Sequence, residues 1–560
     1  MLKFTSSSLA GAATYSNGTI ARTDAAAEQA MKNAARRNFL KITGAGIAGA
    51  AVAAAPVVAA APRAREPEPR GEYDVRAFGA KGDGRALDTA AINQAVAAAA
   101  SAGGGTVRFP SGSYLCYSIH LKGNVVLYLS PGATIVAADA PPSGKSGGYD
   151  APEPNDWDKF QDFGHSHWHN SLIWGEGIDN VSILGPGLIW GKGLSRGSRD
   201  DVLPAGVGNK AISLKNCRNV TLRDFSMLHA GHFAILATGV DNLTIDNLKI
   251  DTNRDGIDID CCRNVRVSNC SVNSPWDDGI CLKSSYGLGY PRPTENVTIT
   301  NCFVTGGYQE GTLLDATYKR FSAGDRAPRN GRIKFGTESN GGFRNIAICN
   351  CVIEDCRGLA LETVDGGLLE DISINNITMR DITDVPIFCR LGRRMRGPPG
   401  SSVGKLRRVN ISDVVASNCL SRQSTLITGI PGHQVEDLRL SNLYILHQGG
   451  GNKEDAATEP PEMEDAYPEP ARFGVMPAHG FFLRHLRGLE MRDVEVKYLK
   501  EDLRPAFVLE DVQNVHLARV TAAHATGVPN FVLKNVENFS LHQSKPVADT
   551  ELEKVAQKQL

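Results

Sequence analysis

The chain lacks any marked excess of one charge. Its 560 residues include 60 Lys and Arg against 61 Asp and Glu, which gives a formal net charge of −1. A protein that binds nucleic acid needs a basic surplus to neutralise the phosphate backbone, so this balance argues against nucleic acid as a partner. Charge alone does not indicate a substrate.

The twelve cysteines include no zinc-type pair with two residues between its members. Without metal-ligand spacing we expect no metal site, and we expect no other cofactor. The cysteines that recur along the repeats are expected to pack as small apolar side chains in a stacked core. One or two disulfides remain possible in an exported protein.

No span after residue 70 is apolar enough to cross a bilayer. Before it, Arg36-Arg37 precedes an apolar run from Ile42 to Val58, and Ala59-Ala60-Ala61 offers a small-residue cleavage site. We predict a twin-arginine signal over residues 1–61 and a periplasmic or secreted protein with no stable membrane insertion after signal removal. A membrane anchor is the competing interpretation. Pro56 interrupts its run, and the long leader leaves Met31 as an alternative start.

An asparagine that leads an alternating strand recurs along the chain. The first intervals are 242 − 219 = 23 and 264 − 242 = 22 residues, and later ones are longer, which indicates inserted loops. Such repeats hold short strands but no crossover helix, so they predict an all-β parallel β-helix. The asparagines are expected at turns, bonding their equivalents above and below. The repeats begin at Asn219, Asn242, Asn264, Asn296, Asn345 and Asn514.

Both ends of such a solenoid expose strand edges and need a cap. The segment from Asp88 into an Ala-rich run that ends at Gly103 predicts an N-capped helix over the first coil. We expect a linker over 62–72, a catalytic β-helix over 73–548 with its cap at about 73–110, and a C-terminal tail over 549–560. The loop 449–477 has no strand pattern and is expected to wall a cleft.

Three aspartates fall into the register of this repeat. Because 255 − 232 = 23 and 278 − 255 = 23, we predict that His232, Asp255 and Asp278 stack in one column, with Asp277 beside them. Alternation leaves Asp258, Asp260 and Lys283 outward, so we expect Asp258 and Lys283 to be substrate contacts. A structural ion pair between Asp260 and Lys283 is also expected. Asp-Gly is also common turn chemistry, so the shared register carries the functional interpretation.

Clustered carboxylates suit glycoside hydrolysis, in which one carboxylate activates water and a carboxylic acid protonates the leaving oxygen. We assign the acid role to Asp277, because its place at a strand entrance lets it point differently from its neighbours. Asp255 and Asp278 would then hold the water.

The segments Asn253 to Ile259 and Asp277 to Lys283 resemble the signature of glycoside hydrolase family 28, the polygalacturonases and rhamnogalacturonases. Phe78 to Gly84 and Asp88 to Ile92 resemble that family's N-terminal cap. The resemblance covers roughly residues 73–420. It implies a right-handed parallel β-helix, an inverting mechanism without metal, Asp277 as the acid, and Asp255 with Asp278 on the nucleophilic water.

The chain departs from this family at its basic residues. Family polygalacturonases carry a histidine on the next coil and an R-I-K triplet after it. Here the stretch that matches the first, 330–337, has no histidine, and the stretch that matches the second, 358–363, has no such triplet. Arg332 and Lys334 spell a similar triplet one coil earlier, and could bind an acidic sugar elsewhere or form a solvated basic face. We therefore favour a rhamnogalacturonan-type or other galacturonic acid and rhamnose glycan over plain polygalacturonate.

Further substrate contacts are expected from side chains that flank the column. Glu338 and Glu362 could bond the hydroxyls of a neutral sugar, although exposed glutamates are usually solvated. His232 and Trp276 are candidate sugar contacts, and His229 is expected to be a turn residue. The loop 165–169, His-Ser-His-Trp-His, could be a metal cluster or a sugar platform at Trp168.

Together these features predict an exported, exo-acting, inverting glycosidase that acts as a monomer on a pectic carbohydrate. Inserts after Ser285, Gly306 and Gly449 would block one end of the groove. A polysaccharide lyase on the same scaffold and a carbohydrate-binding solenoid without turnover remain the alternatives.

Overall fold

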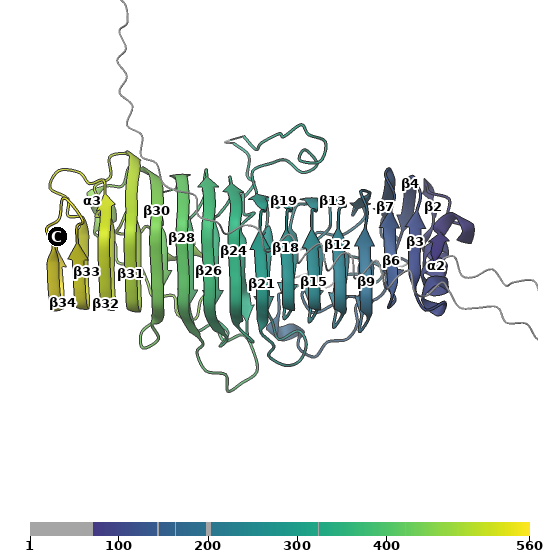
Figure 1. Cartoon of the computed structure of the whole chain (residues 1–560), viewed down its shortest axis with the longest axis horizontal. Helices are drawn as coiled ribbons and strands as arrows, with labels where there is room; N and C mark the ends of the chain where they lie inside the picture. Colours follow the sequence, from purple (N-terminus) through teal and green to yellow (C-terminus); the bar gives the residue numbers. More distant parts are fainter. Residues whose placement is uncertain (1–70, 143–144, 163, 198–202, 323, 421) are drawn as a thin grey trace, which may run out of the picture. The chain divides into compact units, whose positions relative to one another are not determined.

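Short parallel strands recur at coil-length intervals in the computed structural model, which describes residues 71–142, 145–162, 164–197, 203–322, 324–420 and 422–560. Strand follows strand along the solenoid axis, and the chain colours run in sequence order (Figure 1). The predicted parallel β-helix is confirmed. The predicted signal lies outside the described residues. Within them, no helix has the length and apolarity to span a membrane.

The strands stack into three parallel sheets. The site sheet consists of β5 (Ile119–His120), β8 (Ser171–Glu176), β11 (Lys210–Lys215), β14 (Phe233–Thr238), β17 (Asp255–Asp260), β20 (Ile280–Ser284), β23 (Ile333–Ser339), β25 (Leu359–Thr363), β27 (Ile387–Leu391) and β29 (Thr425–Thr428), and it continues on the first residues of three longer strands, β31, β32 and β33. The third sheet consists of β2 (Asp83–Leu87), β4 (Gly112–Cys116), β7 (Ala133–Ala137), β10 (Leu188–Trp190), β13 (Ser226–Leu228), β16 (Lys249–Asp251), β19 (Ser271–Asn273) and β22 (Phe303–Thr305).

The ladder sheet carries the recurring asparagines. It consists of β1 (Glu72–Asp74), β3 (Gly105–Phe109), β6 (Val125–Leu129), β9 (Asp179–Leu184), β12 (Arg218–Arg223), β15 (Asp241–Asp246), β18 (Arg263–Ser268), β21 (Thr294–Thr300), β24 (Phe343–Glu354), β26 (Leu368–Arg380), β28 (Lys405–Cys419), β30 (Val435–Gly449), β31 (Phe481–Lys500), β32 (Phe507–Ala522), β33 (Phe531–His542) and β34 (Thr550–Gln559). From β24 onward its strands also continue the third sheet, because β22 pairs with the second half of β24.

The asparagine ladder forms as predicted. Asn242 donates its side-chain amide to Asn219 at 2.9 Å and accepts from Asn264 at 3.2 Å, and the series continues through Asn296 to Asn345. These residues have φ near +57°, a left-handed conformation that asparagine tolerates well. The ladder is solvent-exposed, so it aligns coils at the surface and does not satisfy buried turns.

Apolar side chains of all three sheets fill one continuous core. The twelve cysteines are all unpaired thiols, and all but Cys349 are buried, as expected for small core residues. The possible disulfides do not form in this structure. Stacked interiors of this kind stabilise every coil through its neighbours.

The two ends are closed differently. The predicted helix is α2 (Thr89–Ser101), which packs on the first coil beside the short 3-10 helix η1 (Val75–Phe78). Asp88 does not cap α2 with its side chain. It accepts from the backbone N–H groups of Lys81 and Gly82. At the other end the expected C-terminal tail is instead β34, which pairs antiparallel with β33.

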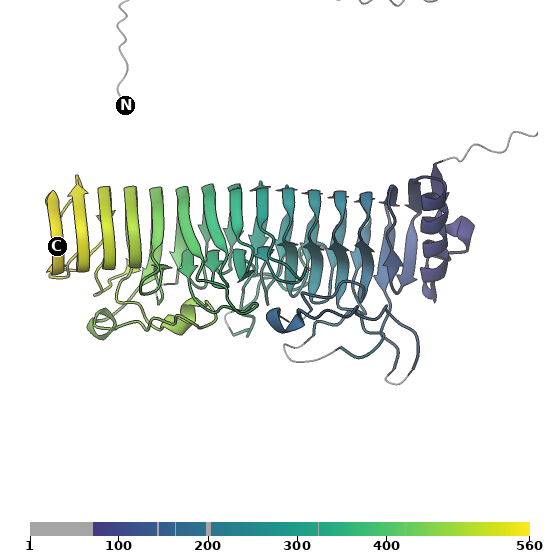
Figure 2. The same ribbon diagram turned by 90° about the horizontal axis from the view of Figure 1, so that it is seen from below.

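Long connections gather on one side of the solenoid, over the site sheet (Figure 2). They contain η2 (Asp158–Phe160), α3 (Lys453–Ala456) and η3 (Pro470–Phe473). The described parts of the inserts lie at 138–170, 306–332, 392–404 and 450–480.

Candidate active site

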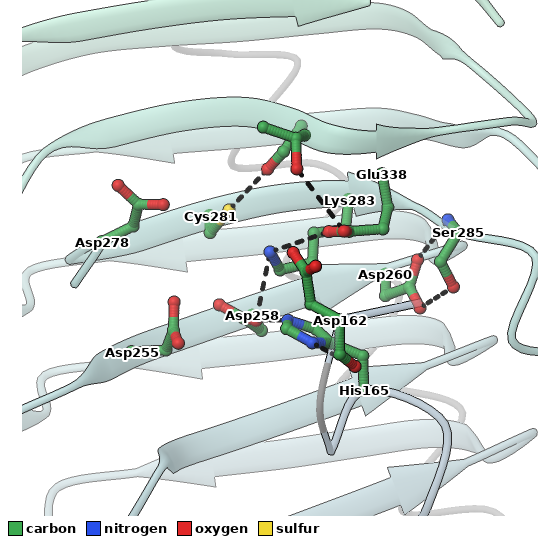
Figure 3. Close-up of polar contacts among 12 residues, drawn as sticks. Asp162, His165, Asp255, Asp258, Asp260, Asp278, Cys281, Lys283, Ser285 and Glu338 are labelled. Atoms are coloured by element: carbon green, nitrogen blue, oxygen red, sulfur yellow. Dashed lines mark hydrogen bonds and ion pairs between the residues drawn. The ribbon is translucent and has the colours of Figure 1, made fainter. Parts of the chain in front are cut away.

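Three carboxylates converge where β17 and β20 begin. Asp255, Asp277 and Asp278 each place one carboxylate oxygen within 4.8 Å of the other two. Asp255 and Asp278 stand on neighbouring strands with their side chains on the same side of the sheet (Figure 3). Gly256 and Gly279 follow them, and a Cβ on Gly256 would lie 2.4 Å from the Gly279 carbonyl oxygen. These glycines let successive coils approach closely enough to bring the acids together.

Asp278 is held as an anion by two cations from the next coil. Arg332 donates Nε–H to Asp278 at 2.9 Å, and Lys334 Nζ lies 3.1 Å from its other oxygen. Burial opposes ionisation, but Lys334 and Arg332 outweigh it and bring the pKa of Asp278 below its usual range. Asp278 is therefore ionised when the cleft is empty.

Asp255 has the opposite environment. Burial, followed by the negative charges of Asp277 and Asp258, raises the pKa of Asp255 well above its usual value. His232 Nε2 lies 3.8 Å from Asp255 Oδ2. Burial and nearby cations, Arg254 first among them, lower the pKa of His232 well below its usual value, so this histidine is neutral. Asp255 is thus the member of the trio that retains a proton most readily.

The predicted register of His232 is wrong by one residue. Phe233, and not His232, pairs with Asp255 across the coils, whereas Ile257 pairs with Ile280 at the expected 23-residue spacing. The coil before Asp255 is one residue shorter than the coil after it. His232 still contacts the trio because its ring stacks on Phe233 with centroids 4.3 Å apart and so turns toward Asp255.

Asp277 lies at the cleft surface and is bound by an arginine. Arg254 Nη2 donates to Asp277 Oδ2 at 2.8 Å, and the backbone N–H of Asp278 donates to Oδ1 at 3.1 Å. Both side chains are partly exposed, at 20% for Arg254 and 25% for Asp277. Asp277 can therefore reach a bound substrate, but in the empty cleft both of its oxygens accept from donors.

Further along the same strands, a buried charge cluster lies beneath the loops. Lys283 Nζ is 3.2 Å from Glu338 and 3.8 Å from Asp258, and His165 Nε2 is 3.5 Å from Asp258 (Figure 3). The expected pair of Asp260 with Lys283 is wrong. The two are register partners, but Asp260 accepts from Ser285 N–H and Oγ–H at 2.8 and 2.6 Å.

This cluster is outward, as alternation predicts, but it is not solvated. Asp258 and Glu338 are fully buried, and Arg396 from the loop after β27 closes over Glu338. Burial opposes the ionisation of Glu338, yet Lys283 and Arg396 together bring its pKa well below its usual value. Asp258, Lys283 and Glu338 are thus buried and do not line the cleft over Asp277, so they are not exposed as the predicted substrate contacts in this state.

Arg332 and Lys334 form no solvated basic face, since both are about 98% buried. Glu362 lies behind them at 4.0 Å from Arg332 Nη2 and 3.9 Å from Lys334 Nζ. Neither Glu362 oxygen has a hydrogen-bond partner among the described residues, and burial raises the pKa of Glu362 to about 7. Glu362 is thus no exposed sugar contact in this state.

A cleft of about 580 Å³ opens over Asp277. It contains the predicted contacts Trp276, Arg332 and Lys334, and Trp276 is 48% exposed at its edge. Basic side chains outnumber acidic ones in its lining by six to two, and these are Arg196, Arg254, Arg332, Lys334, Arg357 and Arg472 against Asp277 and Glu469. The cleft is therefore suited to an anionic ligand.

The loop 450–480 forms one wall of this cleft, as predicted, and contributes Tyr467 and Glu469. Two buried arginines on the site-sheet face hold it by its backbone. Arg390 donates to the carbonyls of residues 462 and 463 at 2.8 and 3.0 Å, and Arg484 donates to those of residues 460 and 461, both at 2.8 Å. These hydrogen bonds hold the loop in the position in which Tyr467 and Glu469 line the cleft.

The histidine-rich loop is neither a metal cluster nor a sugar platform. His167 and His169 bind separate carboxylates, Asp158 and Glu176, each at 2.8 Å. Trp168 is fully buried and donates to Thr238 Oγ1 at 3.0 Å, so it cannot stack on a sugar. His229 has the left-handed φ of +50° expected of a turn residue, and pairs with Glu310.

Among the described residues, the aspartate trio is the group of metal-type ligands close enough to share a cation. Three positive side chains already compensate it, because Arg254 is on Asp277 and Arg332 and Lys334 are on Asp278. These side chains supply the positive charge around the three carboxylates.

Sequence reasoning missed three residues of the site. Arg254 stands where the family signature has threonine, and this one-letter departure signals a changed contact. Tyr467 and Glu469 come from a loop some 190 residues further along the chain, and no periodicity places them.

Family models match two parts of the chain. The model of the right-handed β-helix region matches residues 210–288 and 233–392, and the rhamnogalacturonase A/epimerase, pectate lyase-like model matches residues 73–167. The predicted right-handed fold is confirmed.

A probable polygalacturonase from Vitis vinifera is 23% identical over 406 residues, which cover 66% of this chain and 73% of that protein. The resemblance to glycoside hydrolase family 28 is confirmed. The chain is polygalacturonase-like, a glycoside hydrolase or a related β-helix protein active on carbohydrate.

The chain is also similar to a solved structure over most of its length and to a second curated protein over a short segment. The family 28 exopolygalacturonase structure from Yersinia enterocolitica is 17% identical with a TM-score of 0.55, covering 79% of this chain and 78% of that one, which supports the fold. Alginate lyase 7 from Azotobacter vinelandii is 63% identical over 43 residues, which are 8% of this chain and 5% of that protein.

Proposed function

We propose that the protein is an exported inverting glycoside hydrolase that cleaves galacturonate-containing pectic glycans. Asp277 is the general acid, and Asp255 with Asp278 holds the attacking water. The observation that carries this proposal is the convergence of the three carboxylate oxygens within 4.8 Å beneath a basic cleft. The polygalacturonase relative supports the substrate class.

The acids differ in the way that this chemistry requires. An ionised Asp278 can orient and polarise water, while Asp255, whose pKa is raised, accepts a proton readily once ionised. Asp277 is the member open to the cleft, so it is placed to protonate a glycosidic oxygen. Inversion follows if water attacks from the face opposite to the leaving group.

The structure alters the expected choice of sugar. Two basic residues of the family are missing from later coils, which disfavours plain polygalacturonate. Arg332 and Lys334 bring two cations to the cleft from the coil beside Asp278. We therefore include polygalacturonate with rhamnogalacturonan-type chains as candidate substrates, and we propose exo action because the 450–480 loop walls the cleft.

The test is to incubate the purified protein with defined galacturonate and rhamnogalacturonate oligosaccharides and to follow the products by NMR. We expect the initial product to have the anomeric configuration opposite to that of the cleaved bond, with one chain end shortened stepwise. Retention of configuration would reject the inverting mechanism. Products with a new carbon–carbon double bond and ultraviolet absorbance would instead establish a lyase.

Export, a secreted or periplasmic location and a monomeric state complete the proposal. The paired arginines ahead of the apolar run at 42–58 support the twin-arginine route. Blocking export by replacing both arginines with lysine, followed by cell fractionation, tests it.

A further inference from the structure

We propose that Arg254 couples hydrolysis to the presence of an acidic sugar: it holds Asp277 in the empty cleft and releases it when a substrate carboxylate takes its place. This inference rests on the proposed hydrolase function. It assigns Arg254 as a substrate-binding residue that determines specificity.

Arg254 binds Asp277 directly in the empty cleft. Asp277 accepts from Arg254 at 2.8 Å and from the N–H of Asp278 at 3.1 Å, so both its oxygens act as acceptors. A general acid must carry a proton on the oxygen that faces the leaving group. While Arg254 is bound, Asp277 is therefore arranged as an anion and not as an acid.

The Arg254 side chain has an N–H donor that is not used in the empty cleft. Its Nε–H is buried and has no hydrogen-bond partner among the described residues. A guanidinium binds a carboxylate best with two parallel N–H groups, and here one Nη contacts Asp277. A uronic acid carboxylate in the cleft can offer the second acceptor that Asp277 does not.

Asp278 and Asp255 differ in the basic groups that surround them. Asp278 is bound by Arg332 and Lys334 at 2.9 and 3.1 Å, so its two cations stay with it when a ligand enters. Asp255 has no arginine or lysine within ion-pair distance among the described residues, and its nearest basic atom is His232 Nε2 at 3.8 Å. The proton shared by the trio thus resides on Asp255 in the empty cleft.

The proton count then closes over one turnover. The substrate carboxylate draws Arg254 away, and the proton of Asp255 passes to Asp277. Asp277 gives this proton to the leaving glycosidic oxygen as its bond to the anomeric carbon breaks. Water adds its oxygen to that carbon and gives a proton to Asp255. The trio returns to its starting state, with one proton on Asp255.

The test compares kcat/KM for a galacturonate oligosaccharide and for its methyl ester, which keeps the sugar and the linkage but lacks the negative charge. We expect Arg254→Gln to lower kcat/KM for the free acid by about 100-fold, the cost of losing one charged bidentate contact. For the ester we expect an unchanged or higher kcat/KM, because the variant no longer holds Asp277. Arg254→Lys should restore part of the preference.

Arg218→Gln is the matched control, because Arg218 forms a comparable pair with Asp179 at 2.6 Å on the ladder sheet. It should leave both rates unchanged. An equal loss on acid and ester in Arg254→Gln would overturn the proposal and assign Arg254 to folding or general binding. If the unaltered protein hydrolyses neither compound, it is the proposed function that fails.

A binding measurement tests the same idea without turnover. By calorimetry, Asp277→Asn should bind the acidic oligosaccharide about 10-fold more tightly than the unaltered protein, since no internal anion competes for Arg254. In the double variant Arg254→Gln/Asp277→Asn this gain should disappear. A gain that persists in the double variant would show that general charge repulsion, and not Arg254, is responsible.

Discussion

The ladder sheet and the site sheet stack polar residues along the same solenoid, with opposite results. In the ladder, each asparagine donates to one neighbour and accepts from the next, so identical residues satisfy one another. In the site sheet, the stacked residues Asp255 and Asp278 cannot do so, because two carboxylates repel each other when both are ionised. Arg332 and Lys334 hold Asp278 as an anion, whereas Asp255 has no arginine or lysine within ion-pair distance among the described residues.

Stacking the same residue on successive coils stabilises the solenoid for some side chains and not for others. A neutral side chain that both donates and accepts can be repeated without limit, and it aligns coils at low cost. A carboxylate can be repeated only if its surroundings break the repeat. Loops that bury the site sheet increase this demand, because buried charges must be compensated. The reactive site therefore lies where the coils are least alike.

The largest expected effect is on catalysis. Asp277→Asn keeps the shape of the side chain but cannot donate a proton as an acid, so kcat should fall by about 10²- to 10⁴-fold. Initial-rate assays with pectic oligosaccharides measure this. Asp179→Asn, on the ladder sheet, should retain full activity. Similar rates in the two variants would contradict the acid assignment.

Removing a cation from the site sheet should cost more stability than removing one from the ladder sheet. Arg332→Met leaves buried Asp278 with Lys334 alone, and we expect a loss of about 3 kcal/mol in the free energy of unfolding. Arg218→Met breaks an exposed pair with Asp179 on the ladder sheet and should cost less than about 1 kcal/mol. Urea unfolding distinguishes them, and equal losses would refute the difference in burial cost.

The pH dependence of stability should also originate in the site sheet. The pKa of Glu362 is raised from 4.5 to about 7, so the folded state binds its proton more tightly than the unfolded chain does. The contribution of Glu362 to stability is then greatest below pH 4.5 and falls by up to about 3 kcal/mol as the pH rises to 7. In Glu362→Gln this decline should be absent from melting curves recorded between pH 5 and 8. An unchanged decline would assign it to other groups.

The smallest effect is expected in the ladder. Asn242→Gly keeps the left-handed backbone accessible and removes two side-chain hydrogen bonds, so it should cost about 1 kcal/mol. Asn242→Ala should cost more, because alanine disfavours this conformation. Activity should not change in either variant. A loss of activity would show that coil alignment on the ladder sheet affects the trio.

The β-helix, its asparagine ladder, its helical cap and the aspartate trio were predictable because each depends on repeats or on neighbours in sequence. The aspartates are a fixed number of residues apart, and that number sets their place on successive coils. The predicted position of His232 was wrong, because the corner before Asp255 is one residue shorter than the corresponding corner of the preceding coil. Counting residues locates a side chain only while coil length is constant.

Charge pairing was not predictable by register. Asp260 and Lys283 lie opposite each other, yet the lysine turns to Glu338 and Asp258, since Ser285 already satisfies Asp260. The burial of Arg332, Lys334 and Glu362 depends on loops from distant parts of the chain. Those loops have no period, so the sequence pattern says where they leave the solenoid but not what they cover.

Arg390 and Arg484 hold the 450–480 loop in a way that allows its side chains to vary. Both arginines grip main-chain carbonyls, which every amino acid supplies. Positions such as Tyr467 and Glu469 can therefore be exchanged while the loop keeps its course. A library randomised at these two positions would sample new sugar preferences on an unchanged frame.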